Sequence, residues 1–253
     1  MADTWRRARP CAELDVPWAR AAPARGLRAL ILHGILGPLM DLYTRRRIVG
    51  ARRVAEVDGP VVFVANHSSH MDTPALLRAL PKPRRGRTVV AAAADYFYRS
   101  RPVAWGVSLI FNTVPMQRYG GGLGPDSSRH LDRLIARGWS LLVFAEGTRS
   151  RDGSVGRLRT GGAVLAAEHG LPIVPIHIVG THQAMPPGRR WMRRRGGRVL
   201  PRRHPVEIRF GEPIHPREDE HRAEVMERVR QFFAESGAVT TPPAPRPRAA
   251  CGR

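Results

Sequence analysis

Short apolar runs, each long enough to form one buried strand, recur along this chain and alternate with segments of helical periodicity. The runs are Val61–Ala65, Thr88–Ala93, Thr113–Met116, Ser140–Ala145, Ile173–Val179 and Val206–Phe210. Helices are predicted at Pro74–Leu80, Arg101–Phe111, Ser127–Arg137, Gly162–His169 and Glu218–Glu235. Strands that alternate with helices are typical of α/β architecture. We therefore expect an α/β domain that begins near Ile48.

Histidine and aspartate side chains stand at the first predicted strand-to-helix turn, in the stretch Asn66-His67-Ser68-Ser69-His70-Met71-Asp72. Ligands of open α/β sheets usually bind at such turns, beyond the carboxyl ends of the strands. Imidazole titrates near neutral pH, so a histidine here could accept a proton, and a nearby carboxylate could fix its tautomer. The turn is interpreted as a general base with an orienting carboxylate. The alternative is a polar turn in which Asp72 only caps the next helix.

Three further segments bring arginines to predicted strand ends or helix starts. They are Phe144–Arg151, which contains Gly147, Thr148 and Arg149; Val114–Arg118; and Arg159–Gly162. Glycine lets the backbone approach a ligand closely, and a guanidinium binds phosphate through two N–H donors. A helix start adds backbone N–H groups that favour anions. Together with the histidine turn, these segments predict an anion site within the α/β domain.

The net charge of +21 indicates an anionic partner, a compositional bias towards arginine, or both, since Lys82 is the only lysine among the 42 basic residues. A phosphorylated ligand, an anionic lipid surface and a nucleic acid are the candidate partners. A nucleic-acid-binding protein is the alternative from another functional class. However, the chain has no helix-turn-helix, zinc-finger or RNA-binding signature, and its arginines are spread along its length. The glycines at 120–124 lack a following Gly-Lys-Ser/Thr, and no G-x-S-x-G motif occurs. We therefore expect no nucleic-acid partner, no P-loop and no serine hydrolase site.

The stretch Leu27–Tyr43 is the most hydrophobic in the chain, and three arginines at 45–47 follow it directly. Charged residues and glycines interrupt it, so it falls short of a clean 20-residue transmembrane span. An apolar or amphipathic helix flanked by arginines can lie in the headgroup region of an anionic membrane. We therefore predict a membrane-associating helix over residues 26–47; a core helix with a basic end is the alternative.

The two ends of the chain have compositions typical of poorly ordered segments. Residues 1–25 are rich in Ala, Arg and Pro and are predicted to be a flexible leader, and residues 237–253 a disordered tail. Cys11 and Cys251 lie in these segments and suggest no disulfide or metal site. Near the C-terminal side, Gln183–His204 is a basic loop with Trp191 among its arginines, which fits either a membrane interface or a solvated loop.

In their order and spacing, four short segments resemble the motif blocks of the glycerolipid acyltransferases. They are His67-x-x-x-x-Asp72, Val114-Pro115-Met116-Gln117-Arg118, Phe144-Ala145-Glu146-Gly147-Thr148-Arg149 and Ile173-Val174-Pro175-Ile176. The resemblance covers roughly Gly50 to Ile214. It departs from the family pattern at Ala145, where many members have proline, and at Leu158-Arg159-Thr160-Gly161, where Phe-Lys-x-Gly is usual.

The resemblance implies a mixed, largely parallel sheet flanked by helices, and an acyltransferase domain over residues 48–236. His67 would deprotonate the hydroxyl of the acceptor while Asp72 orients it, and the alkoxide would attack the thioester of acyl-CoA or acyl-carrier protein. Arg118 and Arg149 would hold the acceptor phosphate, Glu146 and Gly147 would shape that pocket, and Thr148 and Arg159 would contact the substrate. No metal and no cofactor besides the acyl donor is implied.

The best-known members of this family convert 1-acyl-glycerol-3-phosphate to phosphatidic acid in phospholipid biosynthesis. The resemblance therefore implies a lysophospholipid acceptor and an anionic membrane surface as partners. The expected place is the cytoplasmic face of the cell membrane, with peripheral or monotopic attachment. Two alternatives remain: the same chemistry on another lysolipid or a specialised lipid, and a metal site formed by His67, His70 and Asp72.

Overall fold

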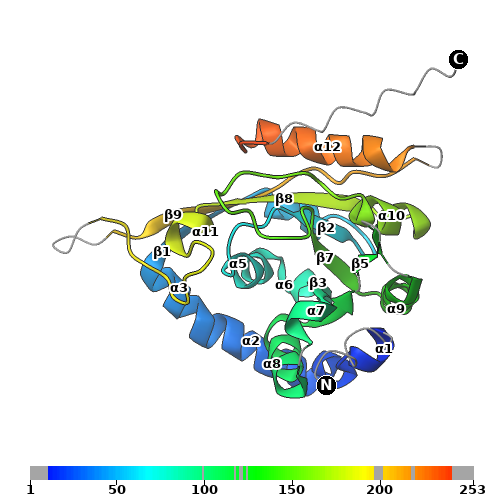
Figure 1. Cartoon of the computed structure of the whole chain (residues 1–253), viewed down its shortest axis with the longest axis horizontal. Helices are drawn as coiled ribbons and strands as arrows, with labels where there is room; N and C mark the ends of the chain where they lie inside the picture. The colour runs from blue at the N-terminus through cyan, green and yellow to red at the C-terminus, as the bar shows by residue number, and fades with distance from the viewer. Residues whose placement is uncertain are drawn as a thin grey trace, which may run out of the picture.

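A seven-stranded sheet forms the centre of the molecule (Figure 1). The computed structural model describes residues 11–240, except for positions 99, 117, 120, 121, 124, 197–201, 218 and 219. The sheet has the order β1-β9-β8-β2-β7-β3-β4, and every pairing is parallel except the antiparallel pairing of β8 with β9. Its strands are β1 (Thr44–Val49), β2 (Val62–Ala65), β3 (Thr88–Ala93), β4 (Thr113–Met116), β7 (Ser140–Phe144), β8 (Ile173–Val179) and β9 (His204–Phe210). The predicted mixed, largely parallel sheet is confirmed.

Strand β2 has buried side chains on both of its faces, as expected for a strand in the interior of a sheet. Val62 and Val64 pack into one core cluster with residues of α9 (Pro125–Ala136), α10 (Gly161–Glu168) and α12 (Arg222–Glu235). Phe63 and Ala65 pack into a second cluster with α5 (Asp72–Ala79). In Figure 1, α12 lies above the sheet and α5 below it, so helices cover both faces.

The remaining elements are short or lie near the edges of the sheet. They are α1 (Cys11–Leu14), η2 (Pro17–Arg20), α2 (Ala22–Leu30), η3 (Ile31–Leu36), α3 (Gly37–Tyr43), α4 (Ala51–Ala55), α6 (Lys82–Arg85), α7 (Ala94–Phe97), α8 (Arg101–Phe111) and α11 (Thr181–Ala184), with a small hairpin of β5 (Arg118–Tyr119) and β6 (Gly122–Leu123). Helices α2, η3 and α3 follow one another without a break, η3 being a π-helical turn. No helix among the described residues combines the length and the apolar character needed to cross a membrane.

The start of the chain differs from its prediction as a flexible leader. Residues 11–25 contain α1, η2 and the first turn of α2, and Cys11 and Ala19 are fully buried. Arg28 explains this packing, because its buried guanidinium donates hydrogen bonds to the carbonyls of Ala19, Ser108 and Leu109 at 2.6, 3.0 and 2.8 Å. Residues 1–10 and 241–253, including Cys251, lie outside the described part.

The helix predicted over residues 26–47 ends earlier in the structure than the sequence suggested. The helix stops at Tyr43, and the arginines at 45–47 belong to β1, which pairs with β9 at the edge of the sheet. Three successive arginines give no apolar alternation, so the sequence did not indicate a strand there. The predicted basic loop 183–204 begins within α11 and ends at the first residue of β9.

Candidate active site

The predicted histidine and aspartate are brought together at the carboxyl end of β2. The Nδ1 atom of His67 lies 2.9 Å from Oδ2 of Asp72, the first residue of α5. The same Oδ2 atom accepts hydrogen bonds from the backbone N–H groups of Ser68 and Ser69, at 2.6 and 2.8 Å. The Asp72 side chain has no exposed surface, whereas that of His67 is 18% exposed. Three donors therefore fix a buried carboxylate against one nitrogen of a reachable imidazole.

This contact determines which nitrogen of His67 is available for chemistry. An imidazole that donates its Nδ1 proton to a carboxylate carries its lone pair on Nε2. The ring also stacks on Phe144 at the end of β7, with 3.9 Å between ring centroids and 18° between planes. The backbone of His67 is held as well, because its carbonyl accepts a hydrogen bond of 2.7 Å from the N–H of Ser150. His67 thus presents Nε2 in a fixed orientation, as a general base requires.

Glu146 contacts the turn that holds His67, and its carboxylate joins that turn to a second loop. Oε1 accepts a hydrogen bond of 2.9 Å from the backbone N–H of His67, and Oε2 accepts one of 3.0 Å from the N–H of Gly156. Burial raises the pKa of Glu146 above its ordinary value, although both N–H bonds act in the opposite direction. Since both oxygens already have backbone donors, the structure gives Glu146 a positioning role, in addition to the shaping of the substrate pocket that the family resemblance implied.

We expect Glu146→Gln to lower kcat about 10- to 100-fold with a much smaller change in acceptor KM. The amide places an NH₂ group against one of the two backbone N–H groups, which leaves a buried donor unpaired at a cost of about 1–3 kcal/mol. Steady-state kinetics with both substrates varied would measure this. Glu168→Gln, on the exposed end of α10, is the control that removes the same charge. An effect confined to acceptor KM would assign Glu146 to binding instead.

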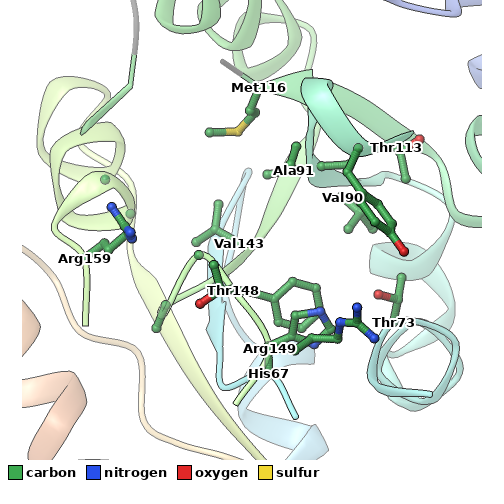
Figure 2. Close-up of a pocket in the computed structure, with 18 of the residues that line it drawn as sticks. His67, Thr73, Val90, Ala91, Thr113, Met116, Val143, Thr148, Arg149 and Arg159 are labelled. Atoms are coloured by element: carbon green, nitrogen blue, oxygen red, sulfur yellow. The ribbon is translucent and has the colours of Figure 1, made fainter. Parts of the chain in front are cut away.

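The turn after Glu146 brings Gly147, Thr148 and Arg149 to a cavity that His67 also lines. Gly147 has φ of 69°, and a Cβ atom there would lie 2.8 Å from Nε of Arg159, so this position requires glycine. Arg159 in turn donates a hydrogen bond of 3.2 Å to the carbonyl of Glu146. Thr148 is exposed, and Arg149 is partly buried, with its Nη1 atom lacking a partner among the described residues. Figure 2 labels Thr148, Arg149 and Arg159 with His67 around this cavity.

Arg118 and His70 are the two remaining candidate residues. Arg118 begins strand β5, but its side chain is outside the part that the structure describes, so its predicted phosphate contact stays a prediction. His70 lines the cavity and keeps an exposed surface. Desolvation by the surrounding protein, together with the nearby Arg149 cation, lowers its pKa. Within the described residues, no cluster of three or more His, Cys, Asp or Glu side chains is arranged to hold a metal ion.

The cavity has a volume of about 480 Å³, and its wall was not predicted from the sequence. Most of that wall is apolar and comes from β3, β4, α8 and β7, with Val90, Ala91, Ala92, Phe111, Met116 and Val143 among the lining residues. In Figure 2, Val90, Ala91 and Met116 lie away from Arg159, Val143 lies between them and Arg159, and Arg149 lies across the cavity from Arg159. The run of alanines at 91–93 was a usable signal, because small side chains on a strand leave space beside it.

This geometry agrees with the comparisons with known proteins. Residues 45–179, more than half of the 253-residue chain, match the family model described as Acyltransferase. The chain therefore belongs to the acyltransferase family.

Among solved structures, the chain is similar to the crystal structure of the 1-acyl-sn-glycerophosphate (LPA) acyltransferase PlsC from Thermotoga maritima. The TM-score is 0.61 and the identity 25%, over 83% of this chain and 81% of that one. Among curated proteins, it is 31% identical over 141 residues to the chloroplastic 1-acyl-sn-glycerol-3-phosphate acyltransferase BAT2 of Brassica napus, with 56% of this chain and 39% of the relative covered. It is 29% identical over 152 residues to human 1-acyl-sn-glycerol-3-phosphate acyltransferase alpha, with 59% and 50% covered. The matched region thus spans half or less of the length of these two curated relatives.

Proposed function

We propose that the protein transfers a fatty acyl group from acyl-CoA or acyl-carrier protein to the free hydroxyl of 1-acyl-glycerol-3-phosphate, which gives phosphatidic acid. The observation that carries this proposal is the position of the His67–Asp72 pair, at a mostly apolar cavity that Arg149 and Arg159 also line. The names of the relatives, which are 1-acyl-sn-glycerol-3-phosphate acyltransferases, support the same reaction.

The reaction follows from the free Nε2 of His67. This atom takes the proton of the acceptor hydroxyl while Asp72 stabilises the imidazolium through Nδ1. The oxygen then attacks the thioester carbon, a C–O bond forms, and collapse of the tetrahedral intermediate breaks the C–S bond. The proton held by His67 passes to the departing thiolate. No acyl-enzyme is needed, because both substrates meet at one base.

The apolar and the cationic residues of the cavity suit the two parts of such a substrate pair. The apolar wall from β3, β4 and α8 excludes water and can take up the acyl chain of the donor. Arg149 and Arg159, which also line the cavity, offer charge-assisted hydrogen bonds to a phosphate. The phosphate of the acceptor would thereby orient the hydroxyl towards Nε2 of His67.

We expect Arg149→Ala to raise the acceptor KM about 10- to 100-fold, because a hydrogen bond to a charged group contributes about 1.5–3 kcal/mol. The acyl-donor KM should stay within about twofold. Initial rates at varied lysophosphatidic acid concentration would measure this. Arg151→Ala is the matched control, since Arg151 is exposed and does not line the cavity. An unchanged acceptor KM and kcat in Arg149→Ala would remove Arg149 from the phosphate site.

The continuous helix of α2, η3 and α3 supports attachment to one face of a membrane, as the sequence predicted. Its exposed positions include Leu27, Leu30, Ile35 and Leu42, which are 46, 63, 59 and 48% exposed. The charged side chains of this helix, Arg25, Arg28 and Asp41, are buried or half-buried. An apolar outer face of this kind is typical of a helix that lies in the headgroup region. We place the enzyme on the cytoplasmic face of the cell membrane, where both acyl donors are found.

The proposed function is tested by a matrix of purified protein against several lysophospholipid acceptors, each with acyl-CoA and acyl-carrier-protein donors. Mass spectrometry of the lipid products identifies both the acceptor and the donor. Phosphatidic acid as the main product would support the proposal. A main product from a different lysolipid would keep the chemistry and change the substrate, and no acyl transfer to any acceptor would contradict both.

A further inference from the structure

A dense group of arginines lies outside the candidate active site, in the segment that connects α11 with β9. It comprises Arg189, Arg190, Arg193, Arg194 and Arg195, together with Arg202 and Arg203, and all seven are exposed. We call this group the arginine rim. The sequence contains no aspartate or glutamate between Glu168 and Glu207. Among the described residues, no arginine of the rim forms an ion pair, whereas Arg46, Arg78 and Arg209 each contact a carboxylate within 3.0 Å. The rim therefore carries uncompensated positive charge.

The rim is attached to the end of the apolar-faced helix. Nε1 of Trp191 donates a hydrogen bond of 3.3 Å to the hydroxyl of Tyr43, and the guanidinium of Arg194 lies 5.9 Å from the centre of the Tyr43 ring. Nη1 of Arg203 donates a hydrogen bond of 3.3 Å to the carbonyl of Asp41. In Figure 1 the segment after α11 lies next to α3, at the opposite end of the molecule from α9. The positive charge thus continues directly from the apolar face of α2–α3.

The chemistry of this surface distinguishes among anionic partners. Trp191 is 57% exposed among the arginines, and Leu42 on the adjoining helix end is 48% exposed. Exposed tryptophan beside cations and an apolar helix face is the pattern of a membrane interface, where aromatic rings lie at the level of the headgroups. An acidic protein or a nucleic acid would match the charge but would not use the adjoining apolar face. Lipid headgroups match both.

We propose that the arginine rim binds the anionic headgroups of the bilayer on which the helix α2–α3 lies. This inference rests on the proposed membrane attachment. It adds that the attachment depends on the charge of the lipids, because the rim binds their headgroups. The rim is also tied to the catalytic turn, because the hydroxyl of Ser69 donates a hydrogen bond of 2.7 Å to the carbonyl of Met185, which precedes the rim. Headgroup binding at the rim therefore sets the position of the active site relative to the bilayer surface.

The test compares the triple variant Arg190→Gln/Arg194→Gln/Arg195→Gln with the full wild-type chain and with Arg133→Gln/Arg137→Gln/Arg222→Gln. The control removes the same charge from exposed arginines of α9, its end and α12. Binding is measured by co-sedimentation with vesicles of phosphatidylcholine alone and with added phosphatidylglycerol. Each cation near an anionic bilayer contributes about fivefold to partitioning. The rim variant should thus bind phosphatidylglycerol vesicles on the order of 100-fold more weakly, and the control should bind like the wild type. The loss should shrink at high salt.

Acyl transfer to a short-chain lysophosphatidic acid kept below its micelle concentration separates this inference from the proposed function. Unchanged activity in that assay with lost vesicle binding supports the rim as a headgroup site. Equal losses in both variants, or no loss in either, would overturn it. Vesicle binding that persists while the KM for acyl-carrier protein rises would also overturn it, and would assign the rim to the donor. Absence of acyl transfer in the wild type would contradict the proposed function without touching the vesicle result.

Discussion

Replacing His67 by alanine is expected to abolish acyl transfer, with kcat reduced on the order of 10⁴-fold, the upper range for loss of a general base. The reason is that Nε2 of His67 is the free end of a hydrogen-bonded pair whose other end is fixed on Asp72. The fold should persist, because the backbone N–H and carbonyl of His67 keep their contacts with Glu146 and Ser150. Initial rates with acyl-CoA and lysophosphatidic acid would be measured beside thermal unfolding.

His70→Ala is the matched control for that variant. His70 lies in the same turn and lines the same cavity, but its ring is not the one that contacts Asp72. We expect its kcat to stay within about tenfold of the wild type, since it supplies no proton acceptor to the reaction. If His67→Ala retained near wild-type turnover while His70→Ala did not, the assignment of the base would be wrong.

Asp72→Asn should be the second most damaging change, with kcat lowered on the order of 10³-fold, somewhat less than the roughly 10⁴-fold loss when the orienting aspartate of a catalytic triad becomes asparagine. One oxygen of Asp72 accepts from Nδ1 of His67 and from two backbone N–H groups. An asparagine that keeps its oxygen towards the N–H groups cannot stabilise an imidazolium, and one that turns its NH₂ group towards them opposes donor to donor. Asp58→Asn, at an exposed position that does not line the cavity, is the control.

The double variant His67→Ala/Asp72→Asn distinguishes this role from a general loss of stability. If Asp72 acts only through His67, its replacement should cost little further activity once the imidazole is absent. A pH–rate profile gives a second readout, because Asp72→Asn should move the limb that reports protonation of the general base, whereas Asp58→Asn should not. Additive losses in the double variant would show that Asp72 acts independently of His67.

Six of the seven strands of the central sheet could be predicted because each is an apolar run. Thr88–Ala93, Thr113–Met116 and Ile173–Val179 have the bounds that the sequence predicted, as does the helix Arg101–Phe111. The seventh strand, β1, could not be predicted, since its three successive arginines give no apolar run and its partner β9 is more than a hundred residues distant in the chain. Local periodicity contains no information about such a pairing.

The site shows the same division between local and tertiary information. His67 and Asp72 are five residues apart, so their spacing alone was enough to predict a pair. Glu146, by contrast, contacts the backbone at 67 and 156, and no sequence pattern indicates which N–H groups a carboxylate will accept. The cavity wall was missed for a similar reason. It consists of ordinary core residues, and only the packing of β3 and β4 leaves a space between them.

The position of β2 in the sheet has a consequence for how such an enzyme can diversify. The base follows β2, which pairs with β7 and β8, whereas Met116 belongs to the edge strand β4, and Ala91 and Ala92 belong to its neighbour β3. Substitutions in β3 and β4 can change the room offered to an acyl chain while the strand that leads to His67 keeps its neighbours. Under the proposed function, the base and the wall that takes up the acyl chain therefore lie in different strands, so the choice of fatty acid can change without rebuilding the catalyst.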